Sequence, residues 1–395
     1  MFKKIISTLL ALSLCVIWAA PVSADGNPEE VMSDEVVPTA ADVADIPAKS
    51  AILMDATSGR VLFEKNPDEP MPPASITKIM TLLLVFEAMD EGKLTYADMV
   101  TCSENANSMG GTQIWLEVGE QMSAEDLIKA TAINSANDAA MALAEHVGGS
   151  EMAFVEMMNQ KAKDLGMANT HFVNPTGLDA DGHVSTARDI ALMSRELLKH
   201  KDITKFSTVW MDSLRDGKTG LTNTNKLVRF YKGCTGLKTG TTDGAGSCLS
   251  ATAERNGLSL IAVSMGSTTS DERFSSCRTM LDYGFSAFEH FTPEILPEDL
   301  TPVAIIKGVD KEVELSYETP EPILIPKGRG GDIEKTIAIQ PDVEAPVLQG
   351  QAVGEARFTL DGETICEIPI TAAKEVPKMT FGNAFQILLR NLLAF

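Results

Sequence analysis

The chain has few basic residues, and this shortage excludes one class of partner. Lysine and arginine number 33 against 55 aspartate and glutamate residues, so the formal net charge is −22. A protein that binds nucleic acid needs a basic stripe to neutralise successive phosphates. We therefore expect no nucleic-acid partner.

Cysteine is scarce and is not arranged for metal binding or for a disulfide framework. Six cysteines are scattered over 395 residues, and no CxxC or paired Cys/His spacing occurs. Cys15 lies in the N-terminal segment, and the remaining five are an odd number. We expect most of these to be small buried apolar residues, and we expect no metal ion or other cofactor.

An extended apolar run stands at the N-terminus. Two lysines precede it, it covers residues 5–20, and Pro21 and small residues at 22–24 follow. This pattern predicts a secretory signal peptide over residues 1–24, and so an exported protein. A retained transmembrane helix is the alternative, but the run is short for a bilayer.

The rest of the chain divides by composition. Residues 25–48 are acidic, contain proline and lack aromatics, which predicts a flexible spacer. Residues 49–292 open with a hairpin pattern that turns at 57–59, continue with a largely helical stretch from Ile76 to Lys201, and end with a second hairpin at Asn256-Gly257. Strands on either side of a helical middle predict an α+β domain with one sheet.

Short β-type runs separated by proline and glycine predict a small all-β domain over residues 293–377. Residues 378–395 have helical spacing of large apolar residues, namely Phe381, Phe385, Leu388, Leu389, Leu392 and Phe395. The resulting amphipathic helix is too short to span a membrane. We expect it to lie on the membrane surface, with Lys374, Lys378 and Arg390 facing anionic lipid. A helix packed on the protein's own core is the alternative.

Ser75 and Lys78 form the chain's one SxxK pattern, directly after two prolines and at the start of an apolar helical run. Residues three apart share one face of a helix, so the lysine amine can reach the serine hydroxyl. Lysine could take the proton of that hydroxyl only if burial or neighbouring cations lower its pKa. Alone, the pattern also fits a capping serine and a solvated lysine.

An SxN pattern occurs at Ser135 and Asn137 and again at Ser103 and Asn105. Either could be a turn or a helix cap. Ser103 stands in a polar stretch, whereas Ser135 lies between an apolar helical run and a helix of small residues. Polar groups in such surroundings need buried partners, which favours Ser135 and Asn137 as site residues.

The tripeptide Lys-Thr-Gly also occurs twice, at residues 218–220 and 238–240. The first copy follows Asp216-Gly217, which predicts a surface turn. The second precedes the Gly-rich turn of the last hairpin, which predicts an edge strand along which a peptide can lie.

The order and spacing of the three motifs resemble the penicillin-recognising serine acyl-transferases. Within these, the chain resembles the low-molecular-weight penicillin-binding proteins, the serine-type D-Ala-D-Ala carboxypeptidases of peptidase family S11. The likeness covers about residues 48–291, with "PASITKIMT", "NSANDAA" and "GLKTGTTDGAG". It implies a β-lactamase/transpeptidase-like domain with an antiparallel sheet and a helical cluster, followed by a small β-rich domain and a C-terminal anchor on the outer face of the cytoplasmic membrane.

The resemblance implies that Ser75 attacks the penultimate D-Ala carbonyl of a peptidoglycan stem pentapeptide and forms an acyl-enzyme that water hydrolyses. Lys78 would be its general base, and Ser135 would pass a proton to the leaving amine. β-Lactam antibiotics would inhibit the enzyme by acylating the same serine. The backbone N–H groups of Ser75 and Thr241 would bind the oxyanion.

The resemblance also implies how substrate is held. Asn137 would bind the substrate amide, and Gly240 would leave room for the peptide along the strand. Lys238 and Thr239, with Arg273, would bind the terminal carboxylate.

Three alternatives remain at this point. A β-lactamase with these motifs needs a glutamate in an ExxLN stretch; the nearest stretch, "RELLK" at 195–199, lacks the asparagine. A non-catalytic cell-wall-binding relative would not need intact motifs. A metal site at Asp179, Asp181 and His183 lacks an accompanying ligand cluster. The family match also has Thr176 where some relatives have histidine, which bears on deacylation.

Overall fold

The computed structural model describes residues 38–393. The predicted signal peptide, Cys15 and the final Phe395 lie outside the described residues. A five-stranded antiparallel sheet organises the first part, in the order β2 (Val61–Lys65), β1 (Ser50–Asp55), β9 (Leu258–Ser267), β8 (Gly246–Arg255) and β7 (Cys234–Thr242). The strand that carries the second Lys-Thr-Gly is an edge strand, as predicted.

Both predicted hairpins are present in this sheet. β1 pairs with β2, and β8 pairs with β9 across Asn256-Gly257. These two residues have φ angles of 51° and 80°, and a two-residue type I′ turn requires positive φ at both positions. The two residues of the turn therefore have the backbone preferences that the turn between β8 and β9 requires.

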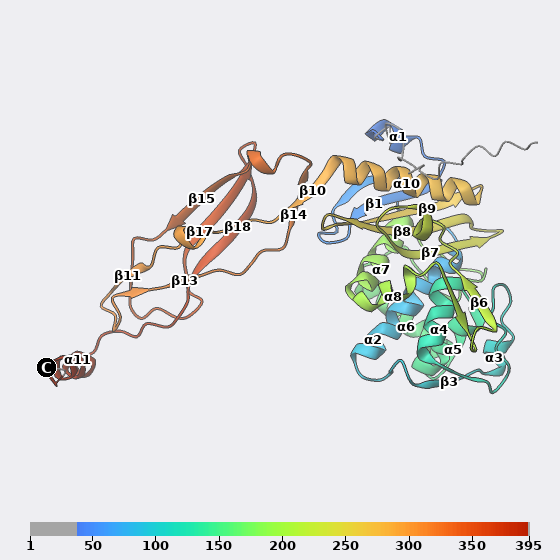
Figure 1. Cartoon of the computed structure of the whole chain (residues 1–395), viewed down its shortest axis with the longest axis horizontal. Coiled ribbons are helices and arrows are strands. Elements are labelled where there is room, and N and C mark those ends of the chain that lie inside the picture. The colour runs from blue at the N-terminus through green and yellow to red at the C-terminus, as the bar shows by residue number, and fades with distance from the viewer. Residues whose placement is uncertain (1–37, 394–395) are drawn as a thin grey trace, which may run out of the picture. The chain divides into compact units, whose positions relative to one another are not determined.

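Helices cover both faces of the sheet (Figure 1): α10 (Ser270–Ala287) packs on one face and α7 (Ala187–Lys199) on the other. Successive residues of a strand point to opposite faces. Leu53 accordingly lies in the core between the sheet and α10. Ile52 and Met54 point to the opposite face and lie in the core that includes α7. The predicted α+β architecture is confirmed.

The predicted helical middle is correct in type but not continuous. Besides α7, its helices are α2 (Lys78–Asp90), α3 (Glu104–Asn107), α4 (Ala124–Lys129), α5 (Asn137–Gly148) and α6 (Glu151–Asp164). A two-stranded ribbon of β3 (Met99–Thr101) and β4 (Gln121–Ser123) interrupts them. Between α7 and β7 lie five short elements: a 3₁₀ turn (Lys201–Ile203), α8 (Thr204–Ser207), β5 (Met211–Leu214), β6 (Thr219–Thr222) and α9 (Leu227–Phe230).

The flexible spacer predicted to reach residue 48 is wrong in its last part. Residues 40–44 form helix α1 (Ala40–Ala44), which Thr39 and Asp42 cap reciprocally. Val43 and Ile46 are buried in the core that α10 covers. The acidic composition of the stretch did not predict this packing. Two apolar residues are enough to anchor a short segment when a sheet formed by other residues supplies the rest of the core.

Beyond α10 the described chain consists mainly of strands. β10 (Phe288–Phe291) pairs with β14 (Ile323–Pro326). A three-stranded sheet contains β12 (Glu312–Val313), β11 (Val303–Ile306) and β16 (Asp342–Glu344), and a four-stranded sheet contains β13 (Leu315–Ser316), β18 (Glu363–Ala372), β17 (Ala352–Leu360) and β15 (Glu334–Ile339). Two apolar clusters, which include Val347 and Phe358, form the core of this part. The predicted all-β domain is confirmed.

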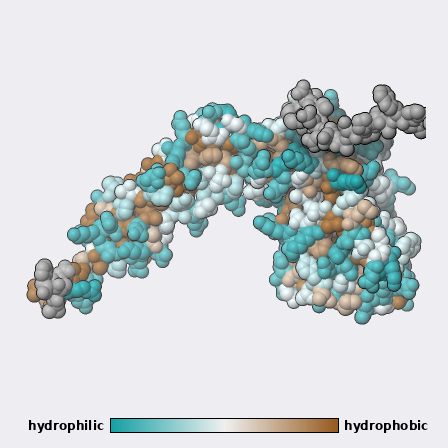
Figure 2. Space-filling view, viewed as in Figure 1, coloured by the Kyte–Doolittle hydropathy of each residue, from teal (hydrophilic) through white to brown (hydrophobic). Residues whose placement is uncertain are grey.

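The last element, α11 (Phe381–Leu393), carries exposed apolar side chains. Phe381 is 89% exposed, and Phe385, Leu388 and Leu392 are 54%, 61% and 70% exposed. Figure 2 shows hydrophobic residues at the surface of this helix. Among residues 38–393, no helix has both the length and the hydrophobicity needed to cross a bilayer.

The five cysteines in the described part of the chain are free. Cys102, Cys248 and Cys277 are buried, and burial raises the pKa of each of these thiols. Cys234 and Cys366 are half-buried. The prediction that most cysteines act as small buried apolar residues is confirmed.

Candidate active site

Ser75 lies in a single 3₁₀ turn (Ala74–Thr77) that leads directly into α2. Another segment presses against this turn, because a Cβ added at Gly177 would lie 1.9 Å from the carbonyl oxygen of Ala74. Gly177 also has a φ of 82°, so both its space and its backbone require glycine. The serine is thus presented at a helix start by a turn that the loop around residue 177 supports.

Lys78 is fully buried and bonded to three different segments. Its Nζ lies 3.0 Å from Ser75 Oγ and donates to Asn137 Oδ1 and to the Thr176 carbonyl, both at 2.6 Å. Burial lowers the pKa of Lys78 well below its ordinary value, and the charge of Lys238 lowers it further. The amine can therefore become neutral and take a proton from the adjacent hydroxyl.

The SxN segment that reaches Lys78 is the one at residue 135. Ser135 is 5% exposed and adopts left-handed backbone angles between a π-helical turn and α5. Asn137 joins Lys78 through Oδ1 and donates through Nδ2 to the Gly110 carbonyl at 2.6 Å. By contrast, Ser103 caps α3 by accepting from Ala106 N, so the second SxN is a helix cap.

The second Lys-Thr-Gly runs beside the Ser75 turn. A Cβ added at Gly240 would come within 2.9 Å of the Pro73 carbonyl oxygen and 3.1 Å of Ser75 N, so a larger residue would displace the strand from the serine. Lys238 is buried, and burial followed by the charge of Arg273 lowers its pKa to about 7. Thr239 Oγ1 donates to Thr224 Oγ1 at 2.7 Å.

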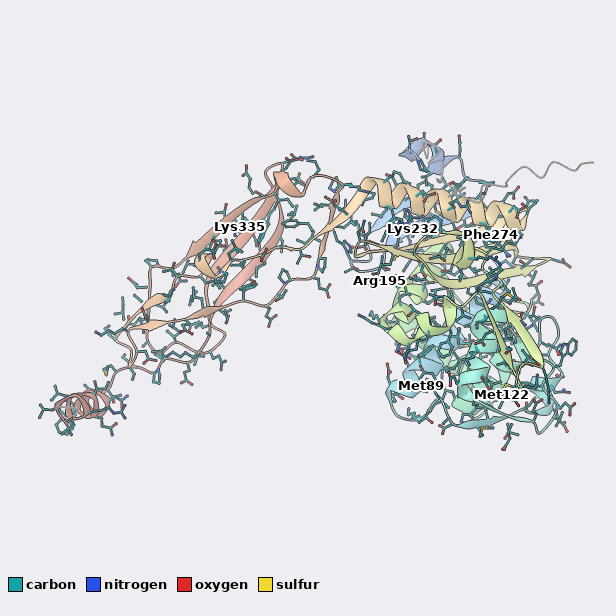
Figure 3. The ribbon with its side chains drawn as sticks, in the orientation of Figure 1. Met89, Met122, Arg195, Lys232, Phe274 and Lys335 are labelled. Carbon is teal, nitrogen blue, oxygen red and sulfur yellow. The ribbon has the colours of Figure 1, made fainter. Side chains whose placement is uncertain are left out.

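Arg273 is buried at the start of α10, next to Phe274, which is labelled in Figure 3. Its Nη1 donates to the Gly240 carbonyl and to Thr241 Oγ1, at 2.9 and 2.7 Å. This guanidinium is therefore attached to the edge strand just beyond Lys238. Its charge faces the strand on which the Lys-Thr-Gly lies.

The first Lys-Thr-Gly is only partly a turn. Lys218 is exposed in the turn between β5 and β6, as predicted. The prediction is wrong for Thr219 and Gly220, which begin β6 and pair with β5. Thr219 pairs with Leu214 and Gly220 with Ser213, so the second strand of the hairpin begins directly after Lys218.

The loop at residues 174–184 has structural contacts that occupy two of its titratable groups, His183 and Asp179. His183 contacts Thr77 Oγ1 through Nε2 at 2.8 Å and accepts from Val173 N through Nδ1, and burial lowers its pKa to about 4. Asp179 accepts from Thr242 Oγ1. Within residues 38–393, no group of three His, Cys, Asp or Glu side chains could hold a metal ion.

The "RELLK" stretch forms the last turns of α7. Arg195, labelled in Figure 3, donates to the carbonyls of Ala56 and Thr57 in the β1–β2 turn. Glu196 pairs with Lys199 one turn along the same helix. The two bonds of Arg195 hold the helix against the hairpin.

Sequence reasoning missed Asp138, which follows Asn137 and is fully buried. Its carboxylate accepts from the backbone N–H groups of Ile114 and Leu116 and so fixes a loop beside the site. A signal was present, because a lone acid in a helix of small apolar residues needs buried hydrogen-bond donors. The hydrogen bond that the Thr176 carbonyl accepts from Lys78 could not be predicted in this way, since every residue has a backbone carbonyl.

Comparisons with known proteins show which family the chain belongs to. The family model of peptidase family S11, D-alanyl-D-alanine carboxypeptidase, matches residues 37–269, and the model of the penicillin-binding protein 5 C-terminal domain matches residues 294–378. D-alanyl-D-alanine carboxypeptidase DacF of Bacillus subtilis is 42% identical over 385 residues, which cover 96% of each chain. DacC of Escherichia coli is 36% identical and covers 85% of this chain and 86% of its own.

Solved structures give the same result. Penicillin-binding protein 5 from Haemophilus influenzae has a TM-score of 0.72 at 32% identity, over 84% of this chain and 98% of that one. The predicted β-lactamase/transpeptidase-like fold is confirmed by this likeness. The chain belongs to peptidase family S11, the D-alanyl-D-alanine carboxypeptidases, and is a serine carboxypeptidase of the low-molecular-weight penicillin-binding type.

Proposed function

We propose that this protein hydrolyses the terminal D-Ala-D-Ala bond of peptidoglycan stem pentapeptides through an acyl-enzyme on Ser75. The observation that carries the proposal is that Lys78 Nζ lies 3.0 Å from Ser75 Oγ, while burial lowers the pKa of Lys78. A serine hydroxyl becomes a nucleophile when such a base takes its proton. β-Lactams would acylate the same oxygen.

Acylation follows from the groups around Ser75. Lys78 takes the proton of Oγ, Oγ attacks the penultimate D-Ala carbonyl, and the N–H groups of Ser75 and Thr241 hold the resulting oxyanion. The approach of β7 to the Ser75 turn supports this pairing of donors. Ser135 then passes a proton to the leaving D-Ala amine, and water hydrolyses the ester.

Substrate binding uses the edge strand and the SxN segment. Asn137 holds the amide on the acyl side, and Lys238, Thr239 and Arg273 bind the terminal carboxylate. Asn137 and Thr239 are engaged with Gly110 and Thr224, so each would exchange that partner for substrate. Gly240 keeps the strand close to Ser75.

The purified protein with fluorescent penicillin and with diacetyl-Lys-D-Ala-D-Ala tests this function. We expect covalent label that persists on a denaturing gel, together with release of D-Ala. Rapid turnover of penicillin would instead support a β-lactamase. Absence of both label and D-Ala release would overturn the proposal in favour of a non-catalytic cell-wall-binding protein.

The two buried lysines predict that kcat/KM falls at both acidic and alkaline pH. Lys78 must be neutral to act as a base, so kcat/KM falls as pH decreases through the pKa of Lys78. Lys238 must be protonated to bind a carboxylate, so kcat/KM falls as pH rises through the pKa of Lys238, about 7. Arg273→Gln removes a like charge, and we expect it to move the alkaline limb of the pH profile upward.

The matched control for this variant is Arg278→Gln, which removes an exposed arginine from the same helix. Its alkaline limb should coincide with that of the wild type. An alkaline limb that stays in place or moves downward in Arg273→Gln would contradict the assignment.

We propose further that the protein is exported and that α11 attaches it to the outer face of the cytoplasmic membrane. The exposed apolar side chains of α11 support the proposal, since the alternative of a helix packed on the protein's own core would bury them. Lys374 is paired with Asp310 at 2.8 Å, which leaves Lys378 and Arg390 as the better candidates for anionic lipid.

Co-sedimentation with phosphatidylglycerol vesicles tests the attachment. The protein should sediment with the vesicles, whereas a variant that lacks residues 378–395 should remain in the supernatant and still release D-Ala. Equal sedimentation of the two proteins would show that another surface binds the membrane.

A further inference from the structure

Trp115 combines an exposed side chain with an unfavourable backbone conformation. Its side chain is 75% exposed, and its φ is 60°. A positive φ is rare for a bulky residue and persists only where surrounding contacts enforce it. The contacts that enforce it here can be identified.

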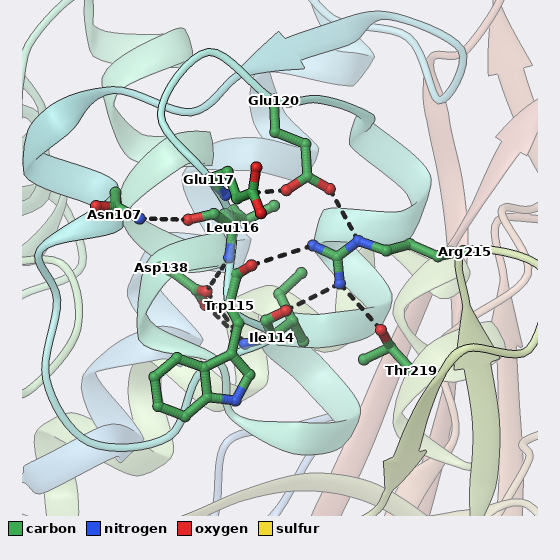
Figure 4. A network of polar contacts seen from close by, with 9 residues as sticks. All are labelled: Asn107, Ile114, Trp115, Leu116, Glu117, Glu120, Asp138, Arg215 and Thr219. Atoms are coloured by element: carbon green, nitrogen blue, oxygen red, sulfur yellow. Dashed lines mark hydrogen bonds and ion pairs between the residues drawn. The ribbon is translucent and has the colours of Figure 1, made fainter.

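The loop that carries Trp115 is held from two sides (Figure 4). On one side, Asp138 accepts from Ile114 N and Leu116 N, at 3.1 and 3.0 Å. On the other, Arg215 donates through Nη1 to the Ile114 carbonyl at 2.9 Å and through Nη2 to the Trp115 carbonyl at 3.5 Å. The backbone on both sides of Trp115 is therefore fixed while its indole is left uncovered.

Arg215 comes from the hairpin that contains the first Lys-Thr-Gly. Arg215 and Asp216 have φ angles of 52° and 55° in the β5–β6 turn, and Thr219 Oγ1 accepts from Arg215 Nη1 at 3.0 Å. Arg215 Nε also donates to Glu120 Oε1 at 2.8 Å, which pairs its charge. The first copy of the tripeptide thus helps to support the Trp115 loop.

The same loop is bonded to Asn137. Asn137 Nδ2 donates to the Gly110 carbonyl at 2.6 Å, and Asn137 N donates to the Thr112 carbonyl at 2.7 Å. A Cβ added at Gly111 would lie 2.9 Å from Asn137 Nδ2, so the loop backbone runs directly against this side chain. The loop borders the acyl side of the substrate, the side that Asn137 holds under the proposed function.

The stretch of sequence around Trp115 carries charge of one sign, and the charge of Arg215, which reaches it from the β5–β6 turn, is paired with Glu120. Residues 94–128 contain no Lys, Arg or His and contain six acids, namely Asp98, Glu104, Glu117, Glu120, Glu125 and Asp126. An indole face attracts a cation, and a carboxylate close by in the chain, that of Glu117, adds to that attraction.

We propose that Trp115 is a specificity residue for the amino acid that precedes D-Ala-D-Ala in the stem peptide. Its indole packs on the side chain of that residue and favours one that ends in a free ammonium group. The inference rests on the proposed function, because it needs the peptide in this site.

Two peptides that differ only at the lysine ε-nitrogen test the inference: Nα-acetyl-Lys-D-Ala-D-Ala, with a free ε-ammonium group, and diacetyl-Lys-D-Ala-D-Ala, in which acetylation has removed that charge. We expect the wild type to favour the ammonium peptide by about three- to tenfold in kcat/KM, mainly through KM. Trp115→Leu should reduce the ratio to about one, and Trp115→Tyr should restore most of it, because tyrosine keeps an aromatic face.

Two further variants separate a contact from a general disturbance. Arg215→Ala frees the loop without touching substrate and should lower the same ratio. Phe230→Leu removes an aromatic that is 63% exposed on α9 and should leave the ratio unchanged.

The outcomes are distinguishable. A wild type without preference, or a Trp115→Leu variant that keeps the wild-type ratio, would overturn the role of Trp115 while D-Ala release upheld the proposed function. Release of D-Ala from neither peptide by the wild type would overturn both.

Discussion

Ser75→Ala is expected to abolish both D-Ala release and covalent penicillin labelling. The variant keeps the 3₁₀ turn and α2 but has no oxygen for Lys78 to activate. Loss of a nucleophile that acts together with its base lowers kcat by about 10⁴-fold or more. D-Ala release in a coupled assay and in-gel fluorescence measure the two losses.

The control for this variant is Ser103→Ala in the other SxN. It removes the cap of α3, which costs about 1 kcal/mol of stability, but should leave acylation near the wild-type rate. Thermal unfolding of both variants would show whether each is folded. A folded Ser75→Ala protein that still released D-Ala would overturn the mechanism.

Lys238→Ala should lower the rate of penicillin acylation by about 10³-fold, as expected when a charged group that binds the reacting anion is removed. Lys238 lies buried on the edge strand, two residues before the glycine that faces Ser75 N, and its charge contributes to the low pKa of Lys78. Its loss therefore removes a carboxylate partner and raises the pKa of the proposed base. Stopped-flow acylation measures the rate.

Lys218→Ala is the matched control, since it changes the same residue type in the same tripeptide. Lys218 is exposed in the β5–β6 turn, and its removal should change acylation by less than about twofold. Equal losses in the two variants would show that the roles of the two copies have been assigned wrongly. Retention of activity in both would place the carboxylate site elsewhere.

Local patterns were predicted well because they depend on near neighbours in sequence. Asn256-Gly257 specifies a type I′ turn by its own backbone preferences, and the spacing of Ser75 and Lys78 places them on one helix face. The rule that buried polar groups need partners separated Ser135 from Ser103 before any contact was visible.

Where the prediction failed, the deciding contact came from another element of the fold. Val43 and Ile46 are buried because α10 and the sheet provide a core for them, although their own stretch is acidic. Thr219 and Gly220 join a strand because β5 is available as a partner. Composition and turn rules consider the residues of a stretch itself and not the core or strand against which it packs.

The sequence by itself determined the motifs, their order, the α+β class and the family. Only the tertiary structure decided that Lys78 is enclosed by Asn137 and Thr176, that Lys238 lies near enough to lower its pKa, and that Asp138 and Arg215 hold Trp115 exposed. The physical reason is that desolvation and charge coupling depend on distances through space. Those distances are set by packing between residues up to about 160 positions apart in the chain, such as Lys78 and Lys238.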